Sequence, residues 1–158
     1  MSKSTLPRLK ALRDEMGKAG ITAFIIPGTD PHQSEYYASH WAARTWISGF
    51  DGSAGTAVVT TNQAGLWTDS RYFLQAAQQL EDSGFELFKE GLPDTPTIEQ
   101  WLLTTLPQGA TIAIDGTLFG ASKAAAMKQN FESHGFRFVS DFTPFDSIWE
   151  KRPSIPKN

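Results

Sequence analysis

The 158-residue sequence contains no cysteine, which excludes disulfide bonds and thiolate metal ligands. It has no run of about 18 consecutive apolar residues, so we expect no transmembrane helix. Residues 1–20 lack the apolar stretch of a signal peptide. Basic residues are not in excess, and the net charge is −3. A broad positive surface is therefore not expected, and we predict neither a nucleic-acid nor a membrane partner.

What the sequence does contain is typical of one globular domain. Hydrophobic residues make up 40% of the chain and aromatic residues 12%, which suffices for a sizeable core. Short apolar runs bounded by turn residues predict strands. These predicted strands cover residues 21–27, 56–61, 64–68, 85–90, 111–115 and 136–140.

Helical periodicity fills most of the intervals between these strands. Four apolar residues near the amino terminus share one helical face, and further helices are predicted over residues 70–80, 121–135 and near 146–151. A helix is also expected after Thr95, a plausible N-cap, with Pro96 in its first turn. The residues expected to face inward from the first two helices are Leu6, Leu9, Leu12, Met16, Phe73, Ala76, Ala77 and Leu80.

The alternation of strands and helices predicts an α/β sandwich. The runs at residues 56–61 and 64–68 leave no room for a helix between them, so they should form an antiparallel hairpin. The fold class is therefore a single-domain sandwich with a mixed sheet of about six strands, flanked by helices. We place the domain at residues 1–150 and the start of a linker at residues 151–158.

Gly49, Gly52 and Gly55 lie within seven residues, a density that raises the possibility of a phosphate-binding loop. Such a loop follows a strand and opens a helix, whereas these glycines precede a strand, and no Gly-Lys-Ser/Thr motif is present. The glycines are better explained by a tight turn with positive φ angles or a close backbone approach.

Asp30, His32 and Glu35 form a polar run after the first predicted strand, and their side chains could ligate a metal. A competent metal site needs at least three convergent ligands. The alternative is that these residues cap the local backbone or face solvent. His40 and His134 are isolated, and Ser53 has no histidine partner at a recognisable spacing.

Arg71 follows a predicted strand and stands at the start of a predicted helix. A cation in that position opposes the helix dipole, which is a mild conflict of the kind seen at functional residues. Two interpretations stay open. Arg71 either contacts a ligand or forms an ion pair with Asp69 or Asp51.

At these residues the sequence resembles a known family. The blocks "DPHQSEYYA", "RTWISGFDGSAGTAVVT", "LWTDSRYFLQAAQQL" and "GLPDTPTIEQWL" are similar to the amino-terminal domain of Xaa-Pro aminopeptidase (aminopeptidase P), in the creatinase/prolidase superfamily. The similarity extends over nearly the whole chain and is greatest between residues 30 and 102. It implies a creatinase amino-terminal-domain-like fold.

The resemblance also implies a function for the longer protein. That protein would be a cytoplasmic, homodimeric metallopeptidase that removes the residue preceding proline from a peptide. Its two metal ions, usually manganese, would be held in a carboxy-terminal catalytic domain that this chain does not contain. We therefore expect no catalytic residue, metal ligand or cofactor in this chain, whose partners would be the catalytic domain and a Pro-containing peptide.

The resemblance assigns one role to a single residue. The arginine of the family's "TD-x-RY" block reaches toward the bound peptide, and Arg71 occupies that position. Asp69 would orient Arg71, and Asp30, His32, Glu35 and Asp51 would line the cleft with it. The domain would then contribute to substrate access, peptide binding and assembly. The alternative is a stand-alone α/β module that binds a peptide or partner without hydrolysis.

Overall fold

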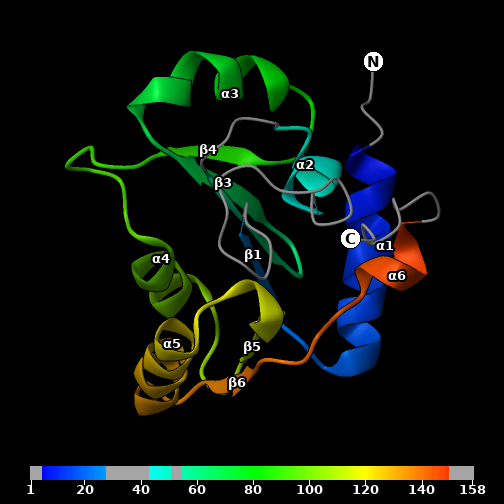
Figure 1. Ribbon diagram of the computed structural model, residues 1–158, viewed down its shortest axis with the longest axis vertical. Coiled ribbons are helices and arrows are strands. Elements are labelled where there is room, and N and C mark those ends of the chain that lie inside the picture. Colours follow the sequence, from blue (N-terminus) through cyan, green and yellow to red (C-terminus); the bar gives the residue numbers. More distant parts are fainter. Residues whose placement is uncertain (1–4, 28–42, 51–54, 150–158) are drawn as a thin grey trace, which may run out of the picture.

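The computed structural model describes residues 5–27, 43–50 and 55–149, and in these residues one six-stranded sheet lies between two layers of helices (Figure 1). The α/β class with a mixed sheet is therefore confirmed. The strands are β1 (Ala23–Pro27), β2 (Thr56–Thr60), β3 (Ala64–Thr68), β4 (Glu86–Lys89), β5 (Thr111–Ala113) and β6 (Arg137–Val139).

The strands lie in the order β4-β3-β2-β1-β5-β6, and β2 alone runs antiparallel to its neighbours. The predicted β2–β3 hairpin is present, with Val58 opposite Gly65. Thr56, the first residue of β2, pairs with both Pro27 and Trp67. The carboxyl ends of β1 and β3 therefore meet the start of β2 at one edge of the sheet, where clefts of α/β folds are built.

Helices of unequal length cover the two faces of the sheet (Figure 1). One face packs against α1 (Thr5–Ala19), α2 (Ala43–Ser48), α3 (Phe73–Gln79) and α6 (Phe145–Ile148). The other face packs against α4 (Ile98–Thr105) and α5 (Ala121–Ser133). Short 3-10 turns occur at η2 (Ser70–Tyr72) and η3 (Gly116–Leu118). None of the described helices combines the length and the apolar character needed to cross a membrane.

Alternation along β1 shows how the two cores share one sheet. Phe24 and Ile26 point into the core beneath α1 and α2, whereas Ala23 and Ile25 point into the core beneath α4 and α5. All four side chains are buried, as expected for a central strand covered on both faces.

The aromatic side chains of β3 and β4 require a glycine in β3. The rings of Trp67 and Phe88 stack with centroids 4.0 Å apart, and they lie over Gly65. A Cβ atom on Gly65 would meet Phe88 at 2.6 Å and Trp67 at 2.8 Å. The Trp67 indole N–H donates to the carbonyl of Pro96 at 2.9 Å, which ties β3 to the segment entering α4.

The expected helix faces are only partly correct. Leu9, Leu12 and Met16 are buried, but Leu6 is 40% exposed. In α3 and at the residue that follows it, Ala76 and Leu80 are buried and Phe73 is half-buried, whereas Ala77 is exposed, contrary to our expectation. Ala76 and Leu80, four residues apart, lie on the buried side of the helix, and Ala77, about 100° further round the helix axis, lies outside it.

Two further features differ from the sequence-based expectation. The N-cap of α4 is Thr97, not Thr95: Thr97 Oγ1 accepts from Gln100 N–H at 3.1 Å, and the Gln100 side chain accepts from Thr97 N–H at 3.0 Å. Pro96 consequently lies before the helix. Helix α2 was not predicted, because six residues are too few to establish a periodic pattern.

Candidate functional site at the carboxyl edge of β3

Asp69 and Arg71 follow β3 directly and form a compact ion pair. Asp69 is the N-cap of η2, and its Oδ1 accepts from the Arg71 backbone N–H at 3.0 Å. The Arg71 guanidinium returns to the same carboxylate, with Nε donating to Oδ1 at 3.1 Å and Nη2 donating to Oδ2 at 2.9 Å. This two-pronged geometry fixes the direction of the guanidinium plane. Of the two ion pairs considered from the sequence, the one with Asp69 is present.

The pair is open to solvent, since the Arg71 side chain is 60% exposed and that of Asp69 is 39% exposed. The Arg71 guanidinium carbon also lies 5.2 Å from the centre of the Tyr72 ring. Hydrogen bonding from Arg71 is the main reason that the pKa of Asp69 lies below its ordinary value. Asp69 therefore stays ionised at neutral pH and orients a cation that remains accessible to a ligand.

Glu90, which sequence reasoning missed, adds a second carboxylate to this edge. It follows β4, and its backbone N–H donates to the carbonyl of Thr68 at 2.9 Å, which places it beside the end of β3. Partial removal from water raises the pKa of Glu90, the negative charge of Asp69 raises it further, and Lys123 acts in the opposite direction. The parallel pairing of β3 with β4 creates this proximity, and no sequence motif announces it.

Arg44 in α2 is a second arginine at this edge, and it was also missed. Its side chain is only 1% exposed. Nη1 donates to the carbonyl of Gly55 at 3.1 Å, and the guanidinium carbon lies 5.1 Å from the centre of the Phe50 ring. The sequence signal was a single basic residue inside the otherwise apolar and small run "WAARTWI".

The remaining predicted site residues, Asp30, His32, Glu35 and Asp51, lie outside the described residues. Within residues 5–27, 43–50 and 55–149, no three His, Asp or Glu side chains gather closely enough to hold a metal ion.

Comparison with known proteins places this geometry in context. The family model of the Creatinase/Prolidase N-terminal domain matches residues 8–151. An Xaa-Pro aminopeptidase of Drosophila melanogaster is 48% identical over 166 residues, which cover 100% of this chain and 27% of that protein. A probable Xaa-Pro aminopeptidase P of Laccaria bicolor is 44% identical, over 98% of this chain and 24% of that protein.

A solved structure supports the same family assignment. The crystal structure of an X-prolyl aminopeptidase from Caenorhabditis elegans, a cytosolic enzyme with a di-nuclear active site, superposes with a TM-score of 0.89 at 33% identity. The match covers 97% of this chain and 26% of that one. The chain thus spans about a quarter of the length of these relatives. Its sequence and its fold together show that it belongs to the creatinase/prolidase N-terminal domain family.

Proposed function

We propose that this chain is the non-catalytic amino-terminal domain of a metal-dependent Xaa-Pro aminopeptidase, which removes the amino-terminal residue that precedes proline. The carrying observation is the match to the C. elegans enzyme, which includes nearly all of this chain and only a quarter of the enzyme. The relatives at 44% and 48% identity are likewise a probable Xaa-Pro aminopeptidase P and an Xaa-Pro aminopeptidase. The rest of the longer protein would supply the catalytic domain and its metal ions, with manganese as the proposed metal.

In this proposal the domain contributes to substrate access and assembly, and Arg71 is its contact with the peptide. Two observations support that role. Arg71 stands at the carboxyl edge of the sheet with most of its side chain accessible. Asp69 holds the guanidinium in one orientation, so a peptide carbonyl or carboxylate would meet a directed donor. Asp69 acts here as a positioning residue. A homodimeric, cytoplasmic enzyme is part of the same proposal.

The test is an activity comparison between this chain and the longer gene product that contains it. Each is purified with manganese, and release of the first residue from a tripeptide with proline in second position is followed. We expect turnover by the longer protein and none by this chain alone. Turnover by this chain that survives chelator-controlled purification and is lost on substituting His32 would contradict the proposal. A reading frame without a metal-binding region would favour a stand-alone binding module.

A further inference from the structure

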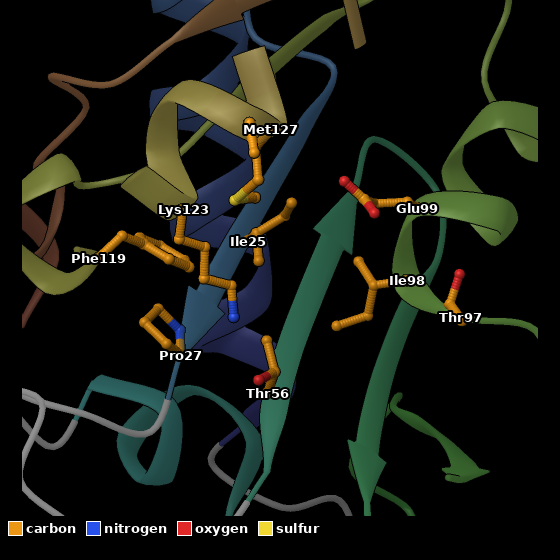
Figure 2. Close-up of a pocket in the computed structure, with 10 residues that line it drawn as sticks. Ile25, Pro27, Thr56, Thr97, Ile98, Glu99, Phe119, Lys123 and Met127 are labelled. Atoms are coloured by element: carbon orange, nitrogen blue, oxygen red, sulfur yellow. The ribbon is translucent and has the colours of Figure 1, made fainter. Parts of the chain in front are cut away.

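A pocket of about 340 Å³ opens between the sheet and the helices α4 and α5, separate from the Asp69–Arg71 pair (Figure 2). Its apolar wall comes from Ile25 of β1, Ile98 of α4, Phe119 after η3 and Met127 of α5. Figure 2 shows Ile98 and Met127 reaching toward the strands from the two helices. A volume near the lower end of the usual 300–1,000 Å³ range suits a ligand of a few residues.

Two opposite charges face each other across this pocket. Lys123 of α5 extends its ammonium group toward Pro27 and Thr56 at the strand ends (Figure 2). The Lys123 Nζ lies 5.7 Å from the centre of the Phe119 ring, so the cation stands beside the apolar wall. Glu99 lines the α4 side of the same pocket. An apolar wall between a cation and an anion matches a ligand that is itself apolar in the middle and charged at both ends.

A smaller pocket of about 140 Å³ adjoins the first one, since both include Thr97 and Ile98 in their walls. Glu90 and Trp67 line it, and so do Thr95 and Pro96. Partial removal from water and the charge of Asp69 raise the pKa of Glu90, and Lys123 acts in the opposite direction, so Glu90 lies near the cation of the first pocket. The adjoining space would accommodate one additional side chain of a ligand.

We propose that this pocket binds a short zwitterionic peptide with an apolar carboxy-terminal side chain. The peptide carboxylate would pair with Lys123, the apolar side chain would pack against Phe119 and Met127, and the amino end would lie toward Glu99. This inference rests on the proposed function only in taking a peptide as the ligand. The site would be a second peptide-binding site of the domain, distinct from the contact made by Arg71.

The test uses the complete 158-residue chain and the tripeptide Ala-Ala-Leu, followed by nuclear magnetic resonance titration. We expect a dissociation constant on the order of 1 mM, with shifts at the Met127 methyl group and the Thr56 and Thr97 amides. Amidating the carboxyl terminus or replacing leucine by serine should each weaken binding about 2- to 5-fold, the range for one exposed charge pair or one small apolar contact.

Matched variants isolate the two charges. Lys123→Gln should remove the preference for a free carboxylate over an amide, whereas Lys128→Gln, on the same helix and paired with Glu132, should retain it. Glu99→Gln should remove the preference for a free over an acetylated amino end, and Glu86→Gln, exposed on β4, should not.

Absence of shifts at about ten times the expected dissociation constant would overturn the proposal, and so would identical behaviour of Lys123→Gln and Lys128→Gln. The binding measurement on this chain does not depend on any peptidase activity. A negative result would therefore leave the proposed aminopeptidase domain standing, while an inactive longer protein would leave this binding site standing.

Discussion

Two arginines stand near the same end of the β2–β3 hairpin, in opposite environments. The Arg44 side chain is 1% exposed and donates to the carbonyl of Gly55, which precedes β2. The Arg71 side chain is 60% exposed and is held by Asp69, which follows β3. Folding removes the Arg44 guanidinium from water, whereas the Arg71 guanidinium stays in contact with water and is only oriented by Asp69.

This contrast predicts different roles for the two charges. Removing a cation from water is expensive, so its remaining hydrogen bonds become essential to the folded state. An exposed ion pair contributes little to stability because solvent screens it. Arg44 should therefore be needed to fold, and Arg71 should be dispensable for folding but available to a ligand.

The largest effect is expected from Arg44→Ala. The substitution leaves the Gly55 carbonyl without its Arg44 donor and opens a cavity against the Phe50 ring. We expect a loss of about 3 kcal/mol or more in the free energy of unfolding, measured by urea denaturation. Arg137→Ala, at an exposed position of β6, is the control and should change the free energy by less than about 0.5 kcal/mol.

Arg44→Met sharpens this comparison because it preserves much of the side-chain volume and removes only the charge and its hydrogen bonds. If Arg44→Ala and Arg137→Ala destabilised the chain equally, Arg44 would have no special structural role.

Arg71→Ala should have its main effect on turnover. In the proposed longer enzyme, loss of the proposed charge-assisted contact to the peptide should lower kcat/KM about 10- to 100-fold. Unfolding of this chain should change by less than about 0.5 kcal/mol, because the side chain is exposed. Arg71→Lys should restore only part of the activity, since an ammonium group lacks the planar fork. A lower melting temperature with unchanged kcat/KM would instead make Arg71 a structural residue.

Gly55→Ala tests how the backbone supports the buried arginine. Gly55 has φ of 155°, and a Cβ there would lie 3.1 Å from the Trp67 carbonyl oxygen and 3.3 Å from Arg44 Nη1. We expect destabilisation of about 1 kcal/mol or more in urea denaturation. Gly17→Ala is the matched control: it lies in α1 with nothing within 4 Å, so it should stabilise by up to about 1 kcal/mol. Equal effects of the two variants would show that Gly55 is not required.

The smallest effects concern pH. The contributions of Asp69 and Glu90 to the stability of the fold should change in opposite directions as the pH rises. The folded pKa of Asp69 is lowered, so its pairing stabilises the fold at neutral pH and is lost below about pH 4. The folded pKa of Glu90 is raised, so its contribution is complete below about pH 4 and is lost as the pH rises through the raised value. Carboxyl-carbon resonances should therefore titrate at lower pH for Asp69 than for Glu90. Arg71→Ala should move the Asp69 midpoint upward, and an unmoved midpoint would exclude Arg71 as the cause.

The features predicted correctly from sequence are those written in local patterns. The hairpin followed from two adjacent apolar runs, and the mixed sheet followed from that hairpin. The N-cap of α4 was predicted wrongly as Thr95, on the strength of Pro96, although the Thr97–Gln100 spacing of a capping box is present in the sequence. Ala77 was misplaced because α3 buries a narrower stripe of its surface than the spacing of its apolar residues implies.

The site was less accessible to sequence reasoning because long-range pairing builds it. Asp69 and Arg71 are two residues apart, so an ion pair between them could be predicted from the sequence. Glu90 reaches the same edge only because β4 pairs with β3, and Arg44 is buried only because the chain folds α2 against Gly55. The charge of a residue is visible in a sequence, but the water that it loses on folding is not.

The aromatic packing gives the molecule an internal optical label on each face of its sheet. The ring centres of Trp67 and Trp101 lie 5.3 Å apart in the core beneath α4 and α5. Those of Trp46 and Trp149 lie 5.3 Å apart against the opposite core. Neighbouring indoles couple electronically, so each pair should contribute its own circular-dichroism signal in the ultraviolet. Replacing one pair by phenylalanine, together with Trp41, which lies outside the described residues, would leave the other pair as the reporter of its layer. Loss of order in the two layers could then be followed separately in the same chain, without an added dye.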